Sequence, residues 1–138
     1  MLVLLDTNIF FSALLTHDGP PGHIYREWRF KRFDLVTSTE QIDELRRASR
    51  NPKFRQILQQ HDFGTLVNLM HRAIVYGPIP RKHQATDPAD SYLLDLIEAA
   101  QPDYAVTGDR RSGLLQLDKL GSTKILKASA FCAEVPHL

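Results

Sequence analysis

The fold is decided by the stretch Leu2-Val3-Leu4-Leu5-Asp6, in which four apolar residues are followed by an acid. The apolar run is typical of a buried strand. A second run, Tyr104-Ala105-Val106-Thr107-Gly108, is also followed by an acid, Asp109. In open α/β sheets the functional crevice lies outside the carboxyl ends of the strands. An acid at that end of two separate strands therefore predicts a shared site.

The rest of the apolar pattern alternates between short strand-like runs and longer helical runs. It predicts strands at 2–5, 33–37, 103–107 and 123–126. It predicts helices at 8–15, 23–32, 39–50, 53–60, 63–75 and 88–100, a short helical turn at 112–117 and a final helical piece capped by Ser129. Strands separated by helices imply right-handed crossovers and a parallel sheet with helices on both faces. Neither a repeat nor a linker interrupts the pattern, so we expect one domain over residues 1–138.

Two helix starts carry recognisable capping signals. Ser38 followed by Gln41 three residues later is a capping box. Asp87-Pro88 combines an N-cap residue with proline at the first helical position. These signals place Glu44 within one helix and Asp90 in the first turn of another.

Size and composition indicate an ordinary globular protein. The chain has 138 residues, 43% hydrophobic and 24% charged, which suits one domain with a real core. A net charge of +1 provides no overall attraction to nucleic acid, so any such surface must be local. The single cysteine, Cys132, excludes an internal disulfide. The start of the sequence lacks the features of a secretion signal, and no apolar run approaches the roughly 20 residues of a membrane span. We expect a cytoplasmic protein.

Each acid alone has a simpler explanation. Asp6 could cap the next helix, and Glu44 could belong to a solvated helix face. Asp90 could be stabilised by the helix dipole, and Asp109 could form a turn. Helical spacing nevertheless places Glu44 on the same face as Leu45, and Asp90 in the stripe of Leu93, Leu94 and Ile97. Four segments thus each present an acid with suitable polarity.

Carboxylates gathered in this way require a neutralising charge. Two of them about 4 Å apart repel by several kcal/mol at an effective dielectric near 20. The usual partner is a hard divalent cation with oxygen ligands. Asn8 and Thr107 would supply supporting polar groups at the two strand ends. Arg110 and Arg111 follow Asp109 directly and are the best candidates for contacts with a substrate phosphate. The constellation predicts metal-assisted chemistry on phosphate esters.

Other chemistries find no support in the sequence. The six histidines fit no zinc-ligand spacing. Neither the P-loop nor the dinucleotide-binding glycine pattern occurs, and there is no nucleophile elbow. Asp6-Thr7-Asn8 lacks the second acid that haloacid dehalogenase-like phosphatases place two residues after the first.

With these residues in hand, the chain resembles the PIN-domain nucleases, in particular the bacterial toxin-like branch of VapC-type ribonucleases. The resemblance covers essentially the whole chain and is carried by four segments: Leu5-Asp6-Thr7-Asn8-Ile9-Phe10, Val36-Thr37-Ser38 leading to Asp43-Glu44-Leu45, Thr86-Asp87-Pro88-Ala89-Asp90, and Val106-Thr107-Gly108-Asp109. There are two departures from this branch: Ser91 stands where a further acid is common, and Arg-Arg-Ser-Gly separates Asp109 from the leucines at 114 and 115.

The resemblance implies a PIN-like three-layer α/β/α sandwich around a mostly parallel sheet of about four to five strands. It implies that Asp6, Glu44, Asp90 and Asp109 hold Mg²⁺ or Mn²⁺ and hydrolyse RNA. It further implies the toxin of a type II toxin–antitoxin pair, with a small antitoxin as partner and a homodimer as the assembly. A DNA nuclease or phosphatase on the same acids, or a binding module with a vestigial site, stays an alternative at this point.

Overall fold

The computed structural model describes residues 1–58, 60–82, 88–108 and 118–135, with the backbone alone at 57, 60, 61 and 88–91. Its central feature is a six-stranded sheet with the order β3-β2-β1-β4-β6-β5. The strands are β1 (Leu2–Leu5), β2 (Asp34–Ser38), β3 (Ile74–Tyr76), β4 (Tyr104–Val106), β5 (Lys119–Leu120) and β6 (Thr123–Leu126). All neighbouring strands are parallel except β5 and β6, which form an antiparallel pair. The described sheet thus has more strands than the four to five that were expected.

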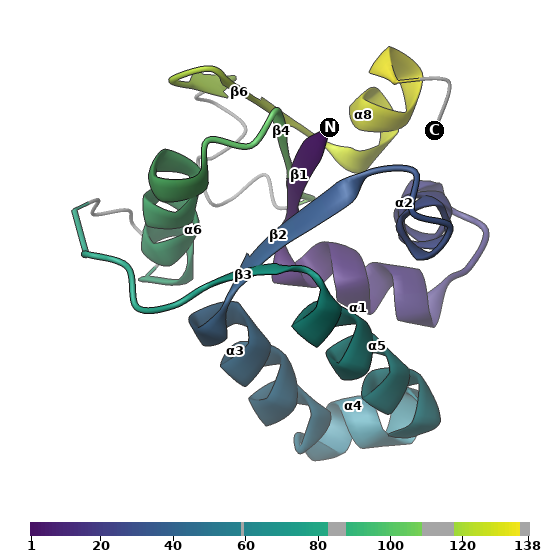
Figure 1. The fold of residues 1–138 in the computed structure, drawn as a ribbon. Coiled ribbons are helices and arrows are strands. Elements are labelled where there is room, and N and C mark those ends of the chain that lie inside the picture. Colours follow the sequence, from purple (N-terminus) through teal and green to yellow (C-terminus); the bar gives the residue numbers. More distant parts are fainter. Residues whose placement is uncertain (59, 83–87, 109–117, 136–138) are drawn as a thin grey trace.

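Helices cover both faces of this sheet (Figure 1). They are α1 (Thr7–Leu15), α2 (Pro20–Arg29), α3 (Thr39–Ser49), α4 (Pro52–Ile57), α5 (Gln60–Arg72), α6 (Pro88–Ala100) and α8 (Ala128–Glu134). In Figure 1, α6 lies on one side of the strands, and α1, α2 and α8 lie on the other. The predicted three-layer α/β/α fold is confirmed.

The two hydrophobic cores follow from the alternation of side chains along each strand. In β1, Val3 and Leu5 enter the larger core, which α1, α2, α5 and α8 cover. Leu4 enters the smaller core, which is filled largely from α6. Since β1 is buried on both faces, it reads as the continuous apolar run seen in the sequence.

Several predicted boundaries are wrong. The helix expected at 63–75 ends at Arg72, and Ile74–Tyr76 form β3 beside β2. Two β-branched residues and a tyrosine favour a strand there. The helix expected at 23–32 begins earlier, at Pro20, because prolines suit the first turn. Ser129 lies inside α8, whose N-cap is Lys127. The helical turn expected at 112–117 lies outside the described residues.

The topology brings several chain segments to one edge of the sheet. Because β1, β2 and β4 are parallel, their carboxyl ends lie together, and α1 and α3 begin there. The next residue after β1 is Asp6, and the next after β4 is Thr107. No helix in the described part of the chain has both the length and the apolar character that a membrane crossing requires.

Candidate active site

Asp6 occupies the junction between β1 and α1. Its backbone N–H donates to the carbonyl of Val106 at 2.9 Å, which continues the β1–β4 pairing to this residue. Asp6 is the N-cap residue of α1, but its side chain makes no capping hydrogen bond. Its Oδ2 instead accepts a hydrogen bond of 2.8 Å from the Thr107 hydroxyl. The side chain is therefore directed across the strand ends towards Thr107.

The surroundings of Asp6 disfavour its charge. Burial, which leaves 8% of the residue exposed, raises the pKa of the carboxyl above its ordinary value, and the negative charge of Glu44 raises it further. The Thr107 hydroxyl and the nearby amides of Asn8 and Thr7 lower the pKa but do not reverse the shift. Glu44 thus lies close enough to Asp6 to act on it electrostatically.

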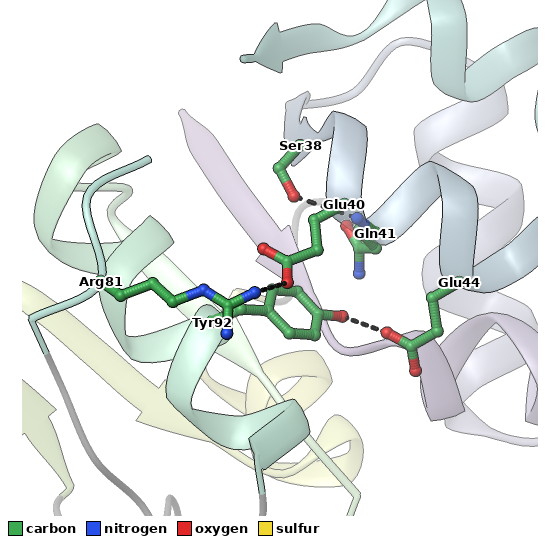
Figure 2. A network of polar contacts seen from close by, with 6 residues as sticks. All are labelled: Ser38, Glu40, Gln41, Glu44, Arg81 and Tyr92. Atoms are coloured by element: carbon green, nitrogen blue, oxygen red, sulfur yellow. Dashed lines mark hydrogen bonds and ion pairs between the residues drawn. The ribbon is translucent and has the colours of Figure 1, made fainter. Parts of the chain in front are cut away.

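Glu44 reaches the site from α3 and is held by a residue of α6. The Tyr92 hydroxyl donates a hydrogen bond of 2.6 Å to Glu44 Oε2 (Figure 2). The same hydroxyl lies 3.2 Å from Thr7 Oγ1 at the start of α1. Burial, together with the charge of Glu44, raises the pKa of Tyr92, so the phenol keeps its proton at neutral pH. Three helices therefore meet through Glu44, Tyr92 and Thr7.

A buried glutamine connects this meeting point to the sheet. Gln41 is fully buried, and its Nε2 donates to the carbonyl of Leu5 at 2.7 Å and to Thr7 Oγ1 at 3.5 Å. Its Oε1 accepts from the Thr37 hydroxyl at 2.5 Å. One of the two hydrogen bonds of the capping box is present: the backbone N–H of Gln41 donates to Ser38 Oγ at 3.1 Å. The Gln41 side chain, however, bonds Leu5, Thr7 and Thr37, joining β1, β2 and α1.

An exposed ion pair lies one helical turn from Glu44. Arg81, from the segment that follows β3, contacts Glu40 of α3 at 3.4 Å (Figure 2). Both side chains are largely solvated, so the pair adds little to stability. It does place a guanidinium close to the start of α3.

The comparison with known protein families settles the family. A profile described as a PIN domain matches residues 2–111, most of the chain. The chain belongs to the PIN-domain family. No curated protein and no solved structure matches it. PIN domains are generally nucleases that use divalent metal ions, which indicates a hydrolase acting on nucleic acid.

The structure brings together some of the residues that were predicted for the PIN-domain site. Asp6, Glu44 and Thr107 converge, whereas Asn8 is exposed and acts on Asp6 through its backbone amide. Asp90 is in the first turn of α6, as expected, but its side chain is not among those described. Asp109, Arg110 and Arg111 lie outside the described residues, so their predicted roles stay predictions.

The two acids whose side chains are described, Asp6 and Glu44, have the chemistry of ligands to a divalent cation. Neither Asp6 nor Glu44 forms an ion pair within residues 1–58, 60–82, 88–108 and 118–135. Burial raises the pKa of Asp6 most, and the charge of Glu44 raises it further; a bound cation would stabilise the charge that both disfavour. Within the same ranges, no three acidic, histidine or cysteine residues group closely enough to hold a metal. A complete site in this PIN domain therefore needs a ligand beyond these two carboxylates.

Sequence reasoning missed the residues that position these acids. Tyr92 was not predicted to take part, Gln41 was predicted only as part of a capping box, and no side-chain partner was predicted for Thr7. A usable signal existed for Tyr92, because a tyrosine beside an apolar helical stripe buries its ring and needs a partner for its hydroxyl.

A cavity of about 380 Å³ lined by Trp28, Asp34 and Ile74 lies at the other end of the strands, where β2 and β3 begin, and is unrelated to the acids.

Proposed function

We propose that this PIN domain is a divalent-metal-dependent endoribonuclease that hydrolyses RNA phosphodiester bonds. The observation that carries the proposal is the convergence of Asp6 and Glu44 at the carboxyl edge of the sheet without a basic partner among the described residues. Asp90 and Asp109 complete the proposed acidic set, with Mg²⁺ or Mn²⁺ as the ion. Residues 1–138 would act as a single nuclease domain.

The roles of the individual side chains follow from their surroundings. A bound divalent ion supplies a lowered water pKa and neutralises charge on the phosphate. Asp6 is more buried than Glu44, the other candidate ligand whose side chain is described, and the Thr107 hydroxyl fixes the rotation of its carboxylate. Glu44 comes from α3, and the Tyr92 hydroxyl occupies one of its oxygens and leaves the other available. We propose Arg110 and Arg111 as contacts to the RNA backbone.

The test is cleavage of single-stranded RNA in the presence of Mn²⁺, followed on denaturing gels. We expect wild-type protein to cleave and Asp6→Asn to lose at least about 100-fold in rate, as expected when an electrostatic group acting in the transition state is removed. Asp43→Asn is the matched control, because Asp43 is an exposed acid on α3, next to Glu44 in the sequence. Equal cleavage by Asp6→Asn would reject the proposed site.

Matched substrates decide between the proposed activity and its competitors. Single-stranded DNA of the same sequence and a phosphate monoester are assayed beside the RNA. Preferential cleavage of DNA or of the monoester would replace the ribonuclease assignment with a DNA nuclease or phosphatase. Absence of cleavage of all three, with RNA binding retained, would leave a binding module.

The proposal extends to the toxin of a type II toxin–antitoxin system, acting as a homodimer with a small antitoxin. Its support is the resemblance of the four acid-bearing segments to VapC-type ribonucleases. Induced expression of the wild-type chain should then arrest growth, and Asp6→Asn should not. Co-expression of a short open reading frame adjoining this gene should restore growth. Arrest by Asp6→Asn to the same extent would contradict this extension.

A further inference from the structure

Tyr92 joins helices that belong to different hydrophobic cores. The buried residues of α3, Ile42 and Leu45, lie in the larger core, whereas those of α6, including Leu93 and Leu96, lie in the smaller one. The hydrogen bond from Tyr92 to Glu44 therefore spans the sheet edge between two independently packed helices. Gln41 already ties α3 to β1 and α1, and the Tyr92 hydroxyl adds a hydrogen bond to the carboxylate of Glu44 itself.

The direction of each hydrogen bond in this region can be assigned. A phenol has one proton, and Tyr92 gives it to the carboxylate of Glu44, which can only accept. The Tyr92 oxygen must then accept from the hydroxyl of Thr7 at 3.2 Å. Thr7, having given its proton to Tyr92, is left to accept from Gln41 Nε2.

The orientation of Gln41 confirms this direction. Its Nε2 faces the carbonyl of Leu5, which can only accept, so the amide cannot be reversed without opposing two oxygens. The hydroxyl of Thr37 donates to the other side of the amide. A chain of hydrogen bonds therefore runs from Gln41 through Thr7 and Tyr92 to Glu44, and bonds aligned in this way reinforce one another.

We propose that Tyr92 is a positioning residue whose hydroxyl, oriented by Thr7, holds Glu44 in place and so sets the affinity of the site for a divalent cation. This inference rests on the proposed function, because it assigns Tyr92 a role at the same acidic site. Phenylalanine would fill the same space beside the smaller core without needing a partner. Packing of the ring therefore does not require the hydroxyl, whereas the hydrogen bond to Glu44 does.

The experiment is titration of Mn²⁺ into the metal-free protein by calorimetry, with Tyr92→Phe compared with wild type. Groups that orient metal ligands typically contribute about 10-fold or more to affinity, so we expect the dissociation constant to rise roughly tenfold. Tyr104→Phe is the matched control, since Tyr104 packs against Phe131 in the larger core. It should leave the dissociation constant unchanged.

A double-mutant cycle separates positioning from a general loss of structure. In a Glu44→Gln background, Tyr92→Phe should have little further effect, because the group through which Tyr92 acts is already altered. Thr7→Val should weaken Mn²⁺ binding in the same direction, and Thr7→Ser, which keeps the hydroxyl, should restore it. The Thr7 pair keeps the test decisive if Tyr92→Phe folds poorly.

The outcomes distinguish this inference from the proposed function. If wild type binds Mn²⁺ and cleaves RNA but Tyr92→Phe binds equally well, the inference is overturned and the nuclease assignment stands. Undiminished weakening by Tyr92→Phe in the Glu44→Gln background would also overturn it. If wild type neither binds Mn²⁺ nor cleaves RNA, the proposed function fails, and the inference fails with it.

Discussion

At the residue scale, the site combines one acid whose charge is disfavoured with polar groups that fix its geometry. Asp6 is buried beside Glu44, and the Thr107 hydroxyl is its hydrogen-bond partner across the strand ends. In the metal-free protein this arrangement costs stability, because ionised Asp6 is both desolvated and repelled. Such a cost is common where residues are arranged for function instead of for folding.

The pKa of Asp6 gives a prediction for the dependence of stability on pH. Because its folded-state pKa is raised above the ordinary 3.8, the folded protein holds this proton more tightly than the unfolded chain does. The contribution of Asp6 to stability therefore falls as the pH rises from its ordinary pKa through its raised folded-state pKa. We expect Asp6→Asn in EDTA to be more stable than wild type at neutral pH, with the difference shrinking as the pH falls towards 3.8. Urea unfolding at a series of pH values measures it; a less stable Asp6→Asn at neutral pH would contradict it.

Gln41 provides a second prediction at this scale. Replacing it with alanine leaves the Leu5 carbonyl and the Thr37 hydroxyl buried without their present partner. Gln41→Ala should lower the free energy of unfolding by about 2–4 kcal/mol. Gln56→Ala, at an exposed position of α4, should change it by less than about 0.5 kcal/mol. Chemical denaturation of both variants makes the comparison, and equal effects would show that the buried network is not stabilising.

The acids and their supports differ in how far sequence alone could predict them. Asp6 and Thr107 were predictable because each directly follows a strand in a parallel sheet, where topology dictates the location. Glu44 followed from its place on the inner face of a helix with a clear start. The Tyr92–Glu44 contact joins residues 48 positions apart, on helices that pack in different cores, and no local pattern encodes such a tertiary contact.

At the element scale, close packing of α1 against α2 depends on a glycine. A Cβ added at Gly22 would lie 2.2 Å from the His17 carbonyl oxygen. That oxygen also accepts a hydrogen bond from Arg26, one turn further along α2. The His17 carbonyl therefore cannot move away from a side chain at position 22 without losing this hydrogen bond. The first turn of α2 contains Pro20 and Pro21, because proline tolerates that position.

Two glycine substitutions should have effects of opposite sign. Gly22→Ala forces the backbone of the α1–α2 turn apart and should cost about 1–3 kcal/mol of unfolding free energy. Gly64 lies within α5 with open space around its Cα, and Gly64→Ala should stabilise the protein by roughly 0.5–1 kcal/mol. Thermal and urea unfolding measure both. A neutral Gly22→Ala would show that the two helices can separate without cost.

Element prediction from sequence failed where one class of structure followed another directly. The apolar pattern of α5 continues through Ile74 and Val75, so periodicity does not separate the helix from β3, and the β-branched residues are the only local signal for a strand. Pairing with β2 decides the outcome, and that pairing is a property of the sheet. Strands buried on both faces, such as β1, were predicted correctly because no competing element has such a short, uninterrupted apolar run.

At the scale of the whole molecule, a bound ion would link the two hydrophobic cores. Asp6, between β1 and α1, and Glu44, in the middle of α3, belong to elements packed in the larger core, whereas Tyr92 comes from α6 in the smaller one. Cation binding at this junction should raise the stability of the entire fold, since only the folded chain assembles the ligands.

Mn²⁺ at about 100 times its dissociation constant should add about 2.7 kcal/mol to the free energy of unfolding. The melting temperature of wild type should rise with Mn²⁺ concentration, and that of Asp6→Asn should respond far less. Differential scanning calorimetry in EDTA and in Mn²⁺ provides the measurement. An equal rise in both proteins would place the ion elsewhere on the molecule.

The two edges of the sheet are unequal. β5 is two residues long and carries Lys119, a combination that discourages further pairing, whereas β3 exposes 48% of Ile74 and 37% of Val75. If two molecules paired through β3 about a two-fold axis, the β3 strands of both would be covered by the contact. Only the short, charged β5 strands would then be left at the outer edges, so a closed dimer would form and no fibre would extend from it.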